Sequence, residues 1–158
     1  MDPILTALDR QFLSVDSRSR QLLNAIGNDL LFSKPREIGN SMAQFSCGEY
    51  ILRSAAMVEQ AFGGITTRLW DDPYEWTLPE KLSTRKLIID YFDEVEATRN
   101  RGFAFIASDS ALFTMIPAPE TLRSLFDILL TALNTAGHFQ GRAFALMQVL
   151  SDEKLPRM

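Results

Sequence analysis

The sequence predicts an all-α protein organised as a four-helix bundle, and three observations support this prediction. Apolar residues recur at alternating steps of three and four positions along several long segments, which is the spacing of helices packed in a left-handed bundle. Long connections rich in proline, glycine and aromatic residues separate these segments. Alternating strand patterns are nearly absent, and residues 111–116 form the one ambiguous run. Four helices with two long connections among them are typical of a bundle.

The last predicted helix, from Pro119 to about Leu150, shows the repeat most clearly. A period of 3.5 residues is typical of the contact line between packed helices. His138, the only histidine, falls about two positions off this line, so we expect its side chain to face solvent. The apolar positions that keep the repeat are Leu122, Leu125, Leu129, Ala132, Ala136, Phe139, Ala143, Leu146 and Leu150.

The first predicted helix runs from Asp2 or Pro3 to about Phe32 and shows the same alternating spacing. Proline suits the first helical turn, where its missing N–H would have no partner inside the helix. Serine and aspartate side chains compete for backbone groups, so a break in this helix would fall in its middle. The residues that weaken it there are Ser14, Asp16, Ser17 and Ser19.

The second predicted helix starts near Ser41, as the N-cap, and ends near Leu69. Its apolar residues form two faces, which predicts helices or a second copy of the chain on more than one side. Gly63 and Gly64 weaken its end, because each glycine costs about 1 kcal/mol relative to alanine inside a helix. One face carries Cys47, Ile51, Ala55, Val58, Phe62 and Ile65, and the second carries Phe45, Leu52 and Ala56.

The third predicted helix runs from Ser83 or Thr84 to about Ile106. The loop before it contains Trp70, Tyr74 and Trp76, so we expect a crossover held against the bundle. The helix also carries the acidic residues Asp90, Asp93, Glu94 and Glu96. A solvated charged face is favoured over paired catalytic carboxylates, because the Glu-x-x-His pairs of di-iron bundles are missing.

Composition limits the function classes. The chain has 158 residues, which we interpret as one domain, 1–158, with 151–158 as a frayed tail. A net charge of −4 without a basic run makes nucleic acid an unexpected partner. No apolar run approaches the roughly 18 residues of a membrane span. One cysteine, Cys47, excludes an intrachain disulfide, and the start of the chain lacks a signal-peptide pattern, so we expect a cytoplasmic protein.

The order of these parts resembles that of the DinB-like (DinB/YfiT) family of helical-bundle proteins. Three features carry the resemblance: residues 46–55 of the second helix, the tryptophan-rich loop behind it, and the segment His138-Phe139-Gln140-Gly141-Arg142. By layout and length the resemblance extends over nearly the whole chain, although the matching motifs are short. It implies the family's up-down-down-up connections between the four helices.

The family often holds a metal ion with one histidine several residues after a serine in its second helix and two histidines four apart in its last helix. By the resemblance, these positions fall at Arg53 (or Ser54, if the register shifts by one), Thr135 and Phe139. Phenylalanine cannot coordinate a cation and arginine repels one. The departure implies no metal and no other cofactor, and it removes support for the thiol-transferase or hydrolase activities proposed for metal-bearing relatives.

Five residues near these positions form the candidate ligand-binding site: Glu49, Arg53, Thr135, His138 and Phe139. In one interpretation Arg53 replaces the charge of the metal and grips an anion, with Thr135 alongside. In the other, Glu49 and Arg53 form an i,i+4 pair on a solvated face, worth roughly 0.2–0.5 kcal/mol. For His138 the simpler interpretation is a surface residue, for Cys47 a buried inert thiol, and for the loop tryptophans packing anchors.

Three hypotheses of function remain. The first is a metal-free DinB-like protein that binds a small molecule or a partner without catalysis. The second is a transferase or hydrolase that acts on a small molecule with a modified site, using Arg53 and His138 in place of the metal. The third is a structural or stress-related bundle that forms a homodimer through the second apolar face of the second helix.

Overall fold

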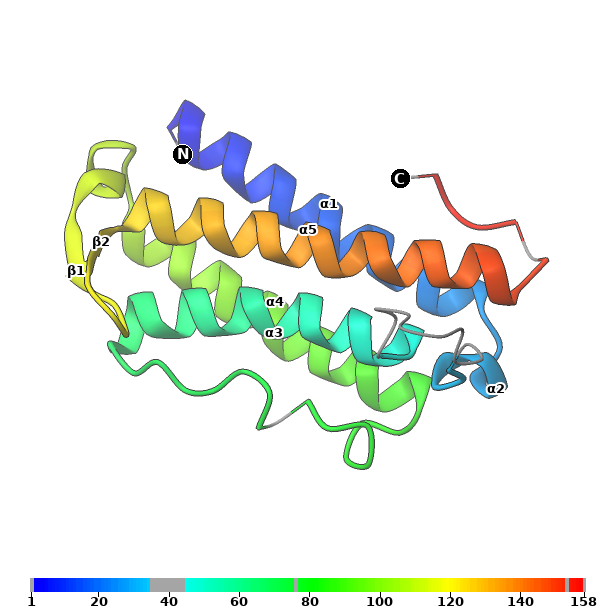
Figure 1. Ribbon diagram of the computed structural model, residues 1–158. Coiled ribbons are helices and arrows are strands. Elements are labelled where there is room, and N and C mark those ends of the chain that lie inside the picture. The colour runs from blue at the N-terminus through cyan, green and yellow to red at the C-terminus, as the bar shows by residue number, and fades with distance from the viewer. Residues whose placement is uncertain (1, 35–44, 76, 153, 158) are drawn as a thin grey trace.

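The computed structural model describes residues 2–34, 45–75, 77–152 and 154–157. Long helices dominate it: α1 (Pro3–Ala25), α3 (Cys47–Thr67), α4 (Arg85–Ile106) and α5 (Leu125–Leu150). Between them lie a short helix α2 (Asn28–Leu31), a 3₁₀ turn η1 (Ser110–Phe113) and a hairpin of β1 (Met115–Pro117) and β2 (Leu122–Ser124) (Figure 1). The predicted all-α class is confirmed.

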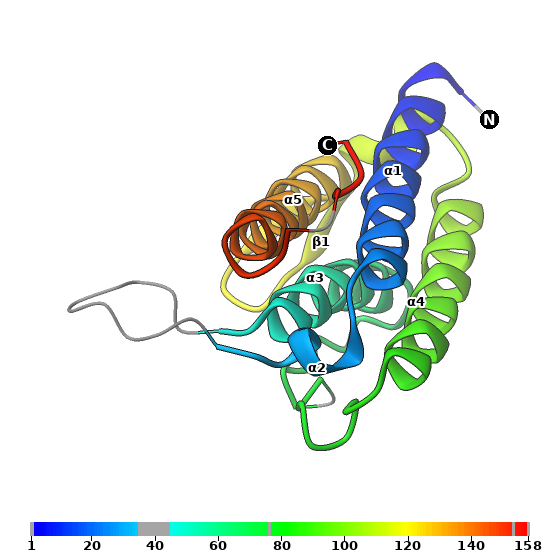
Figure 2. The ribbon, with the colours of Figure 1, turned by 90° about the vertical axis from the view of Figure 1, so that its right-hand side faces the viewer.

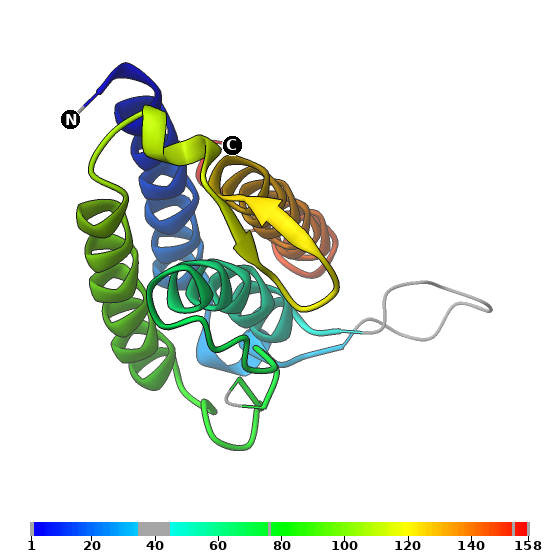
Figure 3. The same cartoon turned by 90° about the vertical axis from the view of Figure 1, so that its left-hand side faces the viewer.

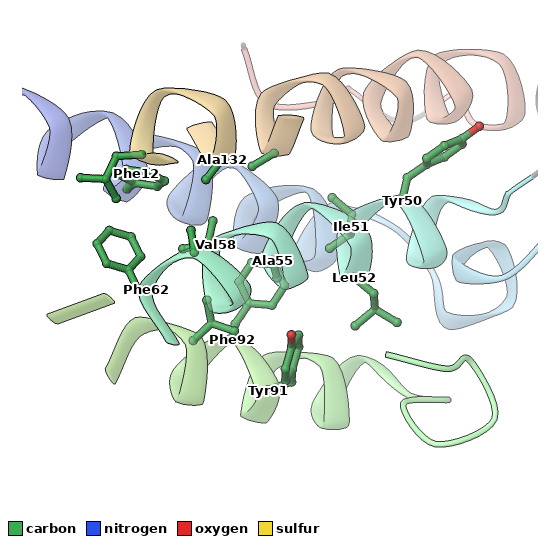
Figure 4. Packing of buried hydrophobic residues seen from close by; sticks show 14 of the residues in the cluster. Phe12, Tyr50, Ile51, Leu52, Ala55, Val58, Phe62, Tyr91, Phe92 and Ala132 are labelled. Carbon is green, nitrogen blue, oxygen red and sulfur yellow. The ribbon is translucent and has the colours of Figure 1, made fainter. Parts of the chain in front are cut away.

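Helix α3 is the central element of the core. Viewed along the bundle, it lies between α4 and α5, and α1 lies between the same two helices on the other side (Figure 2). Its side chains are therefore buried on two faces: Ile51 points toward α5, while Leu52 points toward α4 (Figure 4). Leu52 and Ala56 are both 0% exposed. The second apolar face, which the dimer hypothesis needed on the surface, is thus used inside the monomer.

Short polar side chains set where the helices begin. Ser46 accepts a hydrogen bond from the backbone of Glu49, whose carboxylate accepts in return from the Ser46 backbone, which makes a capping box at the start of α3. Ser41, the predicted start, lies outside the described residues, but a start there is wrong because Phe45 and Ser46 precede the helix without being part of it. Thr84 caps α4, as predicted.

The last helix begins later than its apolar repeat indicates. The predicted start at Pro119 is wrong, because Ser124 caps a helix whose first residue is Leu125. Leu122 continues the repeat in the sequence, yet it pairs with Pro117 in the β1–β2 hairpin and is 60% exposed. This hairpin closes the end of the bundle where α5 begins (Figure 3).

The first helix is not broken in its middle, contrary to the weakness expected at Ser14–Ser19. Helix α1 runs unbroken from Pro3 to Ala25, and the chain leaves the helical conformation at Ile26 and Gly27 before α2. Two of the weakening residues have partners that hold them in the helix. Asp16 pairs with Arg20 one turn later, and Ser19 is buried against α5.

The connection from Arg68 to Thr84 runs along the length of the bundle (Figure 1). Trp70 anchors its first part, because the indole Nε1 donates a hydrogen bond to the carbonyl oxygen of Pro117, 3.1 Å away. The indole packs directly on Gly64, where any Cβ would collide with it. Trp70 is thus a packing anchor, as expected; Trp76 lies outside the described residues.

Candidate functional site

Three buried polar side chains meet in the middle of the bundle, from α1, α3 and α5. The Ser54 hydroxyl donates to the carbonyl oxygen of Ala136, 2.9 Å away. The Gln140 amide donates to the hydroxyl of Ser19 at 2.7 Å and to the carbonyl oxygen of Val15. Ser54 and Gln140 are each 1% exposed, so water does not compete for these bonds. The first, second and last long helices are therefore tied together by polar contacts inside an apolar core.

A cavity of about 20 Å³ lies beside this polar centre, between α1, α3 and α4. That volume holds a water molecule but not an organic substrate. Apolar side chains form most of its wall, and Ser19, Ser54, Asp16, Glu96 and Arg99 supply its polar atoms.

Ion pairs between α1 and α4 cover the cavity. Arg20 in α1 contacts Asp93 at 2.7 Å and Glu96 at 3.4 Å, and buried Arg99 in α4 lies 3.4 Å from Asp9 in α1. Burial raises the pKa of the Asp16 carboxyl, and its hydrogen bond from Arg20 acts in the opposite direction. Two of the acidic residues expected on a solvated face, Asp93 and Glu96, thus join α4 to α1.

The metal implied by the family resemblance does not fit these residues. The side chains that face inward together belong to Ser54, Ala136 and Gln140, one position beyond Arg53, Thr135 and Phe139. A serine, an alanine and a glutamine are not the ligand set of a zinc or nickel ion. Among the described residues, no group of three or more His, Cys, Asp or Glu side chains is placed to share a metal ion.

Arg53 faces the surface and is stacked between two aromatic rings. Its guanidinium carbon lies 3.9 Å from the centre of the Phe45 ring and 4.1 Å from that of the Tyr74 ring. Such cation–π contacts hold the group flat between the rings. The predicted pair with Glu49 is not formed: the Glu49 carboxylate bonds to Ser46 and lies 3.9 Å from Lys34.

The other predicted residues lie on α5 and differ in their exposure. His138 is exposed, as expected, and its ring lies 5.9 Å from that of Phe139. Phe139 is half-buried, with its ring 6.5 Å from that of Tyr50. Thr135 is also half-buried, and within the described part of the chain it makes no hydrogen bond to Arg53. The structure therefore joins Phe139 to α3 through Tyr50, and shows no such contact for Thr135 among the described residues.

Sequence reasoning missed the aromatic partners of Arg53 and the orientation of Gln140. Phe45 and Tyr74 lie 8 and 21 positions from Arg53, and Tyr74 arrives through a loop, so no periodicity predicts the stack. Cys47, by contrast, matches its expected burial. Desolvation raises the pKa of its thiol to about 12, so it is an inert group.

Comparisons with known proteins now bear on this arrangement. No family model matches the sequence, and no curated protein sequence matches it. Among solved structures, a DinB-like protein from Bacillus cereus superposes with a TM-score of 0.74 at 13% identity, with 96% of this chain and 95% of that chain covered. The DinB-like protein YjoA from Bacillus subtilis gives 0.70 at 17% identity, with 96% of both chains covered.

The chain has the DinB-like fold. The predicted resemblance is thereby confirmed over the whole length of the chain. At 13% and 17% identity, the likeness establishes the DinB-like fold and says nothing about a reaction. None of the helices in the described ranges is long and apolar enough to cross a lipid bilayer.

Proposed function

We propose that this protein is a DinB-like binding protein, which recognises a small molecule or a partner without metal-dependent catalysis. One observation carries the proposal: the residues that face inward between α3 and α5 are Ser54, Ala136 and Gln140. By the family resemblance, the histidines of a metal-bearing relative fall at these positions or one position before them. Here the donor atoms of the two polar side chains are already used for contacts within the bundle.

The chemistry of these three residues supports the proposal. A bound cation needs lone pairs from histidine, cysteine or carboxylate side chains at short distance. Alanine has none, and the Ser54 hydroxyl already donates to a backbone carbonyl of α5. Both hydrogen bonds that the Gln140 amide donates go to α1. Ser54 and Gln140 therefore offer a cation at most two neutral oxygen ligands, which is not the ligand set of a zinc or nickel ion.

The shape of the interior supports binding at the surface. The cavity beside Ser54 measures about 20 Å³, far below the roughly 300 Å³ of a typical small-molecule site. A ligand of ordinary size does not fit into this cavity, which favours recognition on the outside of the helices. Arg53 and Phe139, two of the residues predicted for ligand binding, are each partly exposed there.

The enzyme hypothesis uses Arg53 and His138 as substitutes for a metal. The stacking of Arg53 between Phe45 and Tyr74 holds its guanidinium outside the polar centre of the bundle. His138 is exposed and has no described carboxylate as a hydrogen-bond partner to set its tautomer. Neither the stacking of Arg53 nor the exposure of His138 favours acid–base chemistry in the core. The homodimer hypothesis loses the surface that it required, because Leu52 and Ala56 are buried.

Two measurements test the proposal. The protein is produced in medium supplemented with zinc and nickel, dialysed against buffer, and analysed for metal by mass spectrometry. We expect far less than one equivalent of either metal; one tightly held equivalent would overturn the proposal. In the second measurement, thiol donors and small amides and esters are offered as substrates, and we expect no turnover. Turnover that Arg53→Ala abolishes would favour the enzyme hypothesis instead.

A further inference from the structure

Among the described residues, the contacts that hold the Arg53 side chain are those to two aromatic rings. Its guanidinium carbon lies 3.9 and 4.1 Å from the centres of the Phe45 and Tyr74 rings, so both rings pack closely on the group. The N–H groups of a guanidinium lie in its plane and point outward from its edge. Stacking therefore fixes the orientation of the group while leaving the donors on its edge available for a partner.

Those donors have no acceptor in the described part of the chain, where Arg53 makes neither a hydrogen bond nor an ion pair. Other arginines are engaged: Arg20 by Asp16 and Asp93, and Arg123 by Asp127 and Thr131. The carboxylate one turn before Arg53, that of Glu49, is occupied by the Ser46 cap. A half-buried, immobilised guanidinium without an anion stands out in a chain whose net charge is −4.

A second arginine lies at the other end of the same aromatic cluster. The Phe45 ring meets the Tyr50 ring edge-on at 5.6 Å, and the guanidinium of Arg142 lies 5.8 Å from the centre of the Tyr50 ring. Within the described ranges, Arg142 also has no carboxylate partner. Because Tyr50 lies on α3 and Arg142 on α5, the cluster extends across the contact between these two helices.

We propose that the edge of the Arg53 guanidinium binds the oxyanion group, carboxylate or phosphate, of a small ligand, with Arg142 adding positive charge nearby. This inference rests on the proposed binding function and names the ligand class of its site. A guanidinium edge matches both oxyanions, because two parallel N–H donors meet two oxygens. The aromatic rings add a surface on which the organic part of the ligand can pack.

The test is a titration of the full chain by isothermal calorimetry at low ionic strength. The probes are benzoate and phenyl phosphate, and benzamide serves as a neutral probe of similar shape. We expect saturable binding of one or both anions and none of benzamide. Raising the salt to about 0.5 M should weaken the binding several-fold, since an exposed charge contact is screened. Comparison of the two anions tells which oxyanion the site prefers.

Variants locate the binding site. Arg53→Gln should weaken anion binding at least tenfold, and Arg53→Lys should weaken it less, because lysine keeps the charge but lacks the planar fork. Arg68→Gln is the matched control: Arg68 also lies over a ring, that of Phe105 at 5.8 Å, but its edge donates to the carbonyl oxygen of Ile65. We expect this variant to bind like the unmodified protein.

Anions that bind no better than benzamide would overturn the inference, and so would equal losses in Arg53→Gln and Arg68→Gln. Either result concerns the anion site alone, because metal content and turnover are measured separately. A tightly held metal would overturn the proposed function whatever the titration shows. The two failures are therefore distinguishable.

Discussion

The side-chain amide of Gln140 in α5 donates a hydrogen bond to the hydroxyl of Ser19 in α1, 2.7 Å away, inside the apolar core. The same amide reaches the carbonyl oxygen of Val15, so one side chain ties the last helix to the first at two points. A buried amide costs free energy unless its donors are paired, and here they are. Gln140 thus has a structural role one position beyond Phe139, which is the position that the family resemblance implies for a metal ligand.

Replacing Gln140 by leucine should lower the free energy of unfolding by about 1–3 kcal/mol, because the Ser19 hydroxyl then loses its partner in the core. Urea denaturation followed by circular dichroism measures the change. Gln148→Leu is the control, since Gln148 lies on the same helix but is exposed, and its loss should change stability by less than about 0.5 kcal/mol. Equal effects of the two substitutions would show that the buried hydrogen bonds of Gln140 contribute nothing to the free energy of unfolding.

Adjacent glycines in α3 should respond to alanine in opposite ways. No atom lies within 4 Å of a Cβ added to Gly63, so Gly63→Ala should stabilise the protein by up to about 1 kcal/mol through helix propensity. A Cβ on Gly64 would meet the Trp70 ring at 2.3 Å, so Gly64→Ala should destabilise it by displacing the indole. Thermal unfolding of the two variants provides the measurement. A stabilising Gly64→Ala would mean that Trp70 is not packed there.

Burial of Cys47 makes stability depend on pH in the alkaline range. Its pKa is about 12 in the folded protein against an ordinary value of 9.0, so the folded state keeps the proton longer than the unfolded state. The stability due to this difference is complete below about pH 9 and is lost as the pH rises toward 12, at up to about 1.4 kcal/mol per pH unit. Cys47→Ala should therefore lose less stability than the unmodified protein between about pH 8.5 and 10.5. Urea denaturation at several pH values measures the free energy of unfolding of both proteins. If this free energy falls equally with pH in the two proteins, the account is contradicted.

The sequence predicts most of the helical frame because the signals there are local. Thr84 and the apolar spacing after it place α4 correctly, since capping and amphipathicity act within a few residues. The predicted start of α5 is too early because Leu122 continues the helical repeat of apolar residues. Leu122 can equally stand in a strand, and its pairing with Pro117 places it in the hairpin instead of the helix. Helical spacing alone does not reveal the pairing of Leu122 with Pro117, five positions earlier in the hairpin.

The candidate site was predictable only in part, for the same reason. The exposure of His138 follows from its distance from the apolar line. The inward position of Gln140 does not, because its partners Ser19 and Val15 lie more than 100 residues earlier in the chain. The Arg53 stack likewise depends on Tyr74, which a loop brings back to α3. Contacts between distant segments of the chain set the orientation of both side chains, and no local sequence pattern predicts these contacts.

The central claim is that the inward-facing positions of the DinB-like scaffold are 54, 136 and 140, and that their side chains here cannot hold a metal. The most direct test measures the shift in melting temperature caused by zinc in three proteins: the unmodified chain, the variant Ser54→His/Ala136→His/Gln140→His, and the variant Arg53→His/Thr135→His/Phe139→His. We predict a zinc-dependent rise in melting temperature for the first variant alone, because a ligand that binds only the folded state stabilises it. A comparable rise for the unmodified protein, or for the second variant but not the first, would contradict the account.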